Sequence, residues 1–222
     1  GIPLSDSNGD FNKTARSFNP GARWSHYEQS TRTVFSTLEH YFDNDSVAKL
    51  QLTHQINGYD SELAAPNGYM TYPDPVTGTG VTMAGWLGKY RGEVKSNALD
   101  AYLSGPITLF SREHELVVGA SVSKQARGGK NYWEPAGYDH TVPNYYAWNG
   151  NIPRPDWYLV ALDDETTRQS GIYATSRLNL ADDLKLILGS RLSNYDYSYT
   201  NAPLSAAAKR TVRKENGVIV PY

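Results

Sequence analysis

LVVGASVS, the sequence of residues 116–123, alternates between apolar side chains and small or polar ones. Every second position, from Leu116 through Val118 and Ala120 to Val122, is apolar, whereas the intervening positions are mainly Gly and Ser. Successive side chains of a β-strand point to opposite faces of the sheet. The stretch therefore predicts a strand with one apolar and one polar face.

The same period of two recurs along most of the chain. It is present in residues 48–56, 99–104, 172–178 and 184–192. No stretch carries the apolar stripe of a helix of ordinary length, and the best candidate, residues 205–210, is short and reads as a loop. We therefore predict an all-β fold, an antiparallel meander of about seven strands.

The predicted connections alternate in length along the chain. Tight turns rich in Asn, Asp, Gly and Ser are expected at 44–45, 111–113, 182–183 and 216–217. Long loops are expected at 58–83, 124–166 and 197–209. Short turns at one end and long loops at the other are typical of outer-membrane β-barrels, whose strands need about 9–11 residues to span the bilayer.

The composition excludes several classes of protein. The 222 residues suit one ordinary domain or at most two small ones. With 21 basic and 23 acidic residues the net charge is −2, which argues against nucleic acid as the main partner. The absence of cysteine excludes disulfide scaffolds and thiolate zinc sites. No run approaches the roughly 18 apolar residues of a membrane helix.

Two hypotheses remain open from the pattern alone. In a membrane barrel the apolar face contacts lipid, and polar residues such as Lys49, Gln51 and Asp100 face the lumen. His54 falls on the apolar face, where we expect a neutral imidazole near the lipid interface. In a soluble β-sandwich or small barrel, the alternative, the apolar face packs into a core and aromatic loops recognise a ligand.

Residues 169–191 carry a more specific pattern. Gln169, Gly171, Tyr173 and Arg177 are followed by further regularly spaced positions, namely Leu180, Asp182, Leu184, Leu186, Gly189 and Arg191. This stretch resembles a hairpin of the TonB-dependent ferric-siderophore receptors, in their ferripyoverdine and hydroxamate-siderophore branch. Further stretches resemble the same family in the family's order, at 37–42, 73–78, 104–119 and 148–155. Ser111 departs from the pattern, because the family more often has Gly there.

The resemblance implies a wide barrel of 22 strands with an N-terminal plug inside it. Residues 1–222 supply about seven strands, so we expect an internal segment of the barrel without the plug, the TonB box or the later strands. The implied receptor lies in the bacterial outer membrane, binds a pyoverdine-like or hydroxamate ferric siderophore, and imports it with energy coupled through TonB. The siderophore holds the iron, so no cofactor or protein metal ligand is expected.

Aromatic residues in the longest predicted loop form the candidate siderophore site. Aromatic rings bury a large area of ligand, and their hydroxyl or indole groups donate hydrogen bonds. Two more aromatics precede or begin the third strand and are expected to face the same vestibule. The full candidate set is Trp86, Tyr90, Tyr132, Trp133, Tyr138, Tyr145, Tyr146 and Trp148. Packing among the loops, without ligand contact, is the alternative role for each of them.

No catalytic or metal-binding motif is found, so we expect no enzyme. A nucleophile elbow of the G-x-S-x-G type is absent, and the five histidines lack the i, i+4 spacing of a zinc site. The acidic run 163–165 is expected to be a solvated loop, with a cation site as the weaker alternative. A hydrolase on a β scaffold is disfavoured for the same reasons.

Overall fold

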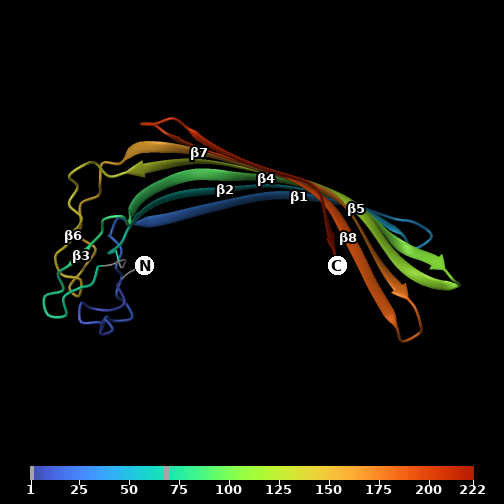
Figure 1. Cartoon of the computed structure of the whole chain (residues 1–222), viewed down its shortest axis with the longest axis horizontal. Coiled ribbons are helices and arrows are strands. Elements are labelled where there is room, and N and C mark those ends of the chain that lie inside the picture. The colour runs from blue at the N-terminus through green and yellow to red at the C-terminus, as the bar shows by residue number, and fades with distance from the viewer. Residues whose placement is uncertain (1–2, 68–70) are drawn as a thin grey trace.

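The computed structural model describes residues 3–67 and 71–222 and shows one large sheet of seven antiparallel strands (Figure 1). Each long strand pairs with the next one along the chain, so the predicted all-β meander of seven strands is confirmed. The long strands are β1 (His26–Tyr41), β2 (Val47–Ala64), β4 (Leu87–Leu109), β5 (Arg112–Trp133), β7 (Tyr158–Asn179), β8 (Lys185–Pro203) and β9 (Lys209–Pro221). The two-residue strands β3 (Val81–Thr82) and β6 (Thr141–Val142) form a second, small sheet.

The register separates the two faces of the large sheet. Residues that pair across the strands form an uninterrupted apolar row, namely Leu38, Leu50, Ala101, Ala120, Ile172, Leu192 and Ile219. Ile172 and Ile219 are 60% and 67% exposed although they are apolar. We call the face that carries this row the apolar face. Because these apolar side chains are exposed, the apolar face fits contact with lipid and not burial in a core.

The other face, the polar face, carries hydrogen-bonded side chains at the same height. The Tyr173 hydroxyl donates to Asp100 at 3.2 Å, and the Arg191 guanidinium donates to Ser121 at 2.7 Å. The Lys49 ammonium lies 2.7 Å from the Glu39 carboxylate. Such a face suits the lumen of a barrel.

The connections 42–46, 110–111 and 180–184 lie together at one end of the sheet. Three of the four predicted tight turns are confirmed, at 42–46, 110–111 and 180–184. Phe110 and Ser111 have φ values of 51° and 59°, so they form the mirror-image two-residue turn that matches the twist of a hairpin. No helix in the described part of the chain is long and apolar enough to cross a membrane.

The predicted turn at 216–217 is wrong. Asn216 and Gly217 lie inside β9, where both oppose the single residue Asn194 of β8. Gly217 has a φ of 69°, and its N–H donates to the Asn194 side chain at 3.0 Å. A β-bulge needs this left-handed glycine just as a tight turn does, so the dipeptide alone did not separate the two.

The predicted loop boundaries were also wrong, because the strands are about twice as long as expected. β4 has 23 residues, and β5 and β7 have 22 each. The long connections therefore shrink to 65–86 and 134–157, and the one expected at 197–209 is only the short segment 204–208. Beyond the apolar rows both faces of the strands are polar, so the alternation that reveals a strand in the sequence is lost there.

A cap of loops covers part of the long-loop end of the sheet, at the left of Figure 1. It consists of residues 3–25 with the connections 65–67, 71–86 and 134–157, and we call it the loop cap. Its buried core contains Met83, Val142 and Tyr145, and strands β3 and β6 join two of the connections through the Val81–Val142 pair. The cap is therefore held together by its own apolar core.

The two faces predict unequal losses of stability for the same substitution at neighbouring positions. Leu50→Arg places a charge near the middle of the apolar face and should destabilise the full-length protein in bilayers by about 2–4 kcal/mol. Gln51→Arg, the matched control, places the same side chain on the polar face beside Asp100 and should cost far less. Denaturant titration of folding into lipid vesicles measures both. Equal losses for the two variants would contradict the assignment of faces.

Candidate functional site

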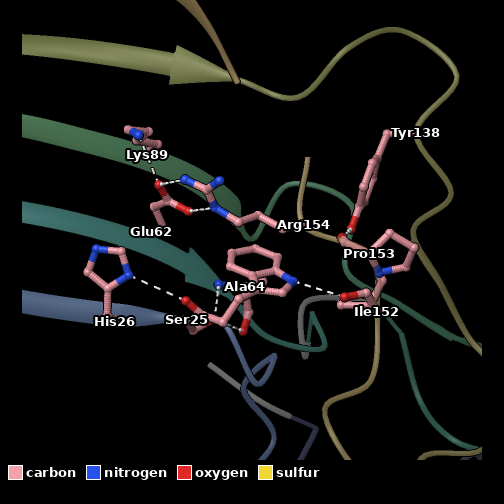
Figure 2. Close-up of polar contacts among 10 residues, drawn as sticks. Ser25, His26, Glu62, Ala64, Lys89, Tyr138, Ile152, Pro153 and Arg154 are labelled. Atoms are coloured by element: carbon pink, nitrogen blue, oxygen red, sulfur yellow. Dashed lines mark hydrogen bonds and ion pairs between the residues drawn. The ribbon is translucent and has the colours of Figure 1, made fainter. Parts of the chain in front are cut away.

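The loop cap is anchored to the sheet by one buried carboxylate (Figure 2). Glu62, near the end of β2, is only 2% exposed. Arg154 of the loop cap donates to its two carboxylate oxygens, with both N–O distances at 2.6 Å, and the Lys89 ammonium of β4 lies at 2.8 Å. A bidentate guanidinium pair fixes both distance and orientation. The pair therefore sets where the connection 134–157 meets β2 and β4.

The two cations also control the ionisation of this carboxylate. Hydrogen bonds from Arg154, with the help of Lys89, lower the pKa of Glu62 from 4.5 to about 2, although burial opposes the shift. Glu62 lies beyond the apolar rows, outside the part of β2 that is expected to span a membrane. It is therefore ionised at neutral pH.

Hydrogen bonds to backbone carbonyls connect the pieces of the loop cap. The Trp24 indole donates to the Ile152 carbonyl at 3.0 Å, and the Trp148 indole donates to the Pro20 carbonyl at 3.0 Å. The Ser25 hydroxyl accepts from the Ala64 N–H at 3.1 Å, at the point where the N-terminal segment enters β1 (Figure 2). The two indole bonds each join residues 128 apart in the sequence, and the Ser25–Ala64 bond joins residues 39 apart, so the cap is a folded unit.

Four of the eight predicted site residues lie within the packing of this cap. Tyr145 is 1% exposed, and its hydroxyl donates to the Pro3 carbonyl at 3.0 Å. The Tyr146 hydroxyl donates to Asn12, and the Tyr138 hydroxyl donates to the Pro153 carbonyl. Trp148 makes the indole bond to Pro20. In this structure the four rings shape the cap, which is the alternative role that the sequence left open.

The other four predicted residues lie at the adjoining ends of β4 and β5. Trp86 and Tyr90 are each 43% exposed, and Trp133 is 60% exposed. Tyr132 is half-buried, with the Lys89 ammonium 5.5 Å from the centre of its ring. We call these four residues the β4–β5 aromatic patch. Three of its rings are open to a ligand, and Lys89 connects it to the Glu62 anchor.

Sequence reasoning missed a set of polar-face tyrosines on β8. Tyr195 and Tyr197 stack with ring centroids 6.4 Å apart, and the next tyrosine on this face is Tyr199. The period-two spacing of tyrosine in 195–199 was the signal that pointed to them. They line the polar face, which Tyr90 of β4 shares, so they continue the aromatic residues of this face toward the middle of the sheet.

The acidic run 163–165 is not the solvated loop that we expected. It lies inside β7, where alternate residues point to opposite faces. Asp163 accepts hydrogen bonds from Tyr199, Asn201 and Asn131, while Glu165 pairs with Arg127 at 2.9 Å. Within residues 3–67 and 71–222, no group of three or more acidic or His side chains is arranged to hold a metal ion.

Comparison with known protein families identifies the family of this chain. Residues 2–222 match the family model described as TonB dependent receptor-like, beta-barrel. The chain belongs to the TonB-dependent receptor β-barrel family. The long-loop end of the sheet is accordingly the extracellular end, and the short turns are periplasmic.

Individual relatives agree with this assignment. The chain is 44% identical over 222 residues to the ferripyoverdine receptor of Pseudomonas aeruginosa, and 31% identical over 228 residues to the ferric-pyoverdine BN7/BN8 receptor of Pseudomonas putida. All of this chain is covered, but only 25% and 27% of those receptors. The chain thus spans about a quarter of the relatives that it matches.

A solved structure extends the likeness to three dimensions. The crystal structure of the outer-membrane ferripyoverdine receptor of Pseudomonas aeruginosa, bound to ferripyoverdine, matches with a TM-score of 0.84 at 44% identity. The match covers 100% of this chain and 28% of that chain. The seven-stranded meander is therefore a segment of a TonB-dependent receptor barrel, and its location is the outer membrane.

The anchor predicts a local effect of neutralising Glu62. Glu62→Gln leaves Lys89 and the 55%-exposed Arg154 side chain without a charged partner, and the loss of hydrogen bonds to a charged group costs about 1.5–3 kcal/mol. In the full-length receptor, residues 134–157 should then exchange amide hydrogens and be cleaved by protease far faster. Glu93→Gln is the matched control, because its pair with Lys95 is half exposed and worth at most about 1 kcal/mol. Equal protection in both variants would contradict the anchor.

The low pKa of Glu62 predicts how the cap responds to acid. Because the folded pKa of about 2 lies below the ordinary 4.5, the stabilisation is fully present above about pH 4.5 and is lost as the pH falls toward 2. Protease protection of residues 134–157 should therefore weaken between pH 4.5 and 2 in the wild-type receptor. Glu62→Gln should lack this transition. A transition centred near pH 6 would identify a different group.

Proposed function

We propose that this chain forms part of the barrel wall and loop vestibule of an outer-membrane receptor for a ferric siderophore of the pyoverdine or hydroxamate type. The observation that supports this most is the 44% identity with a ferripyoverdine receptor, which extends over the whole chain and includes its loops. Loops are the most variable parts of related proteins. Alignment of the loop cap as well as the strands therefore supports a shared class of ligand.

In this proposal the loop cap positions the β4–β5 aromatic patch above the lumen. The Glu62–Arg154 pair holds the long connection against the strand ends, and the packed tyrosines keep it in shape. The open rings of Trp86, Tyr90 and Trp133 offer large, rigid surfaces to a flat chromophore or to an aliphatic arm of the ligand.

The proposed process is transport and makes or breaks no covalent bond. The siderophore keeps the iron coordinated throughout, so the iron is cargo and the receptor needs neither a cofactor nor metal ligands of its own. Import against a gradient requires energy, which we propose TonB delivers through the plug of the full-length receptor. The contribution of residues 1–222 is recognition of the ligand and part of the wall of its path.

Binding measurements on the full-length receptor test the proposal. Trp133→Ala and Tyr90→Ala should each weaken the Kd for a ferric pyoverdine by roughly thirtyfold, because an aromatic anchor of a binding site contributes about 2 kcal/mol. Phe11→Ala is the control, since Phe11 is an aromatic residue in the N-terminal part of the cap, is 82% exposed and does not belong to the patch. Calorimetric titration gives the Kd of each variant.

The same titrations can contradict the proposal at two levels. Failure of the wild-type receptor to bind any ferric pyoverdine or hydroxamate siderophore would overturn the ligand class. Unchanged affinity of both patch variants, with binding intact, would overturn only the choice of residues. Siderophore-dependent iron uptake that persists in cells without TonB would overturn the proposed energy source.

A further inference from the structure

Two neighbouring hairpins at the periplasmic end of the sheet are joined by one buried histidine. His114 of β5 is 4% exposed. Its Nε2 atom lies 3.0 Å from the carbonyl oxygen of Leu109, the last residue of β4. Its Nδ1 atom lies 3.0 Å from the backbone nitrogen of Asn179, the last residue of β7. The ring therefore bridges the β4–β5 and β7–β8 hairpins, whose turns lie at the right of Figure 1.

These two contacts fix the protonation state of the imidazole. A carbonyl oxygen can only accept, so Nε2 carries a proton and donates to Leu109. A backbone N–H can only donate, so Nδ1 carries no proton and accepts from Asn179. The ring of His114 is therefore neutral in this structure and present as a single tautomer. An imidazolium ion has a proton on both nitrogens and cannot accept the Asn179 N–H.

The bridge replaces the backbone ladder where the pairing of β5 and β7 ends. The last paired residues of the two strands are Glu115 and Arg177. Beyond this pair, the Asn179 N–H donates to His114, and the Asn179 side-chain amide donates to the Glu113 carbonyl at 2.6 Å. Each of these bonds uses a side chain. The ends of the two strands are thus held together by His114 and Asn179.

The β4–β5 turn next to the bridge is strained. Phe110 and Ser111 have φ values of 51° and 59°, in the left-handed region that residues with a Cβ atom disfavour. Phe110 is also 95% exposed, so its ring gains nothing from packing. Arg112 and Asp182 join the two hairpins by an ion pair at 2.9 Å, but the Asp182 side chain is 96% exposed, so the pair adds little. The buried bonds of His114 are therefore the main restraint on this turn.

A vacant acceptor lies on the residue that the histidine contacts. Among the residues that the structure describes, the buried side-chain oxygen of Asn179, Oδ1, has no hydrogen-bond partner. Buried acceptors without a partner are rare. A protonated His114 has a proton on Nδ1 that this oxygen can accept once the amide rotates, whereas the neutral ring has none to offer. The bridge thus has a second arrangement, in which the Asn179 N–H and the Glu113 carbonyl lose their present partners.

The charges around the bridge are compatible with both states of the ring. β4 carries no charged residue between positions 101 and 109. The charged residues of the other strand ends and of the β7–β8 turn are Arg112, Glu113 and Glu115 of β5, Arg177 of β7, Asp182 and Asp183 of the turn, and Lys185 of β8. Three of them are basic and four are acidic. Protonation of His114 therefore brings the set to neutrality, and no excess of positive charge opposes it.

We propose that His114 is a proton-sensitive latch between the periplasmic ends of β5 and β7. With a neutral ring the latch is closed, and the turns at 110–111 and 180–184 are held together. Protonation at Nδ1 releases the Asn179 N–H, and both turns become mobile while the ladder between the strands stays intact. β4, β5, β7 and β8 all lie inside the sheet, so the latch is complete within this chain. It does not depend on which siderophore the receptor binds.

Hydrogen exchange of the full-length receptor in lipid bilayers, followed by mass spectrometry, tests the latch. Exchange is compared at about pH 8 and about pH 5, a range that spans the titration of imidazoles, and is corrected for the intrinsic effect of pH on exchange. Protection of residues 109–116 and 177–184 should fall about tenfold at the lower pH, the effect of losing one hydrogen bond. The turn at 42–46 is closed by backbone bonds between Phe42 and Ser46, and its protection should not change.

Two variants assign the response to the histidine. His114→Gln keeps a donor for the Leu109 carbonyl but cannot titrate, so protection of the two segments should be weak at both pH values. His40→Gln is the matched control, because His40 is an exposed histidine at the periplasmic end of β1 whose ring contacts Phe42. It should respond to pH as wild type does. If His114→Gln does not fold, as judged by heat-dependent gel mobility, the wild-type comparison of the latch segments with the turn at 42–46 decides.

Four outcomes would overturn the proposal. They are equal protection of the latch segments at both pH values in wild type, an equal response of the turn at 42–46, a pH response that persists in folded His114→Gln, and loss of the response in His40→Gln.

Discussion

The constraint on which the whole structure depends is the need of every backbone N–H and C=O group for a partner in a medium without water. In a bilayer a segment that is not helical can meet this need only by continuous pairing between strands. The meander does so along strands of up to 23 residues, with a register shift at only two places in the described sheet. Once that ladder is fixed, each side chain is assigned to one face, and no residue can change face without a bulge.

The strands then divide into three zones along their length. Tight turns join them at the periplasmic end, exposed apolar rows face lipid in the middle, and polar extensions carry the chain above the membrane. The described residues hold one cluster of buried apolar side chains, and it lies in the loop cap beyond those extensions. The middle zone therefore depends on lipid for its stability, whereas the cap depends on its own core and on the Glu62 anchor.

The sequence predicted the strands in the middle zone, where one face is apolar and the other polar. It missed the strand ends above the membrane, where both faces are polar. Alternation around residues 48–56 and 116–123 predicted strands, faces and the hairpin order, because lipid on one side and a polar lumen on the other demand it. Asp164 and Glu165 lie on opposite faces of β7 beyond the apolar rows and both are charged, so strand and loop look alike there. The Asn216-Gly217 pair misled because bulges and turns share the same left-handed backbone.

The candidate site was predictable only in part for a related reason. Aromatic residues concentrated in the longest connection were visible, but burial of Tyr145 and exposure of Trp133 depend on how three distant segments pack. The anchor was invisible, because Glu62 and Arg154 are separated by 92 residues and neither lies in a motif. Long-range pairs of this kind leave no local pattern in a single sequence.

Accessibility of neighbouring positions on β2 tests the central claim, that one face of the sheet meets lipid and the other the lumen. The chain contains no cysteine, so single cysteines at Leu50, Gln51, Leu52 and Thr53 can carry a spin label in the full-length receptor, freed of any other cysteine, in bilayers. The account predicts that dissolved oxygen, which concentrates in lipid, relaxes the labels at Leu50 and Leu52 strongly and those at Gln51 and Thr53 weakly. Uniform relaxation along the four positions, or alternation in the opposite phase, would contradict it.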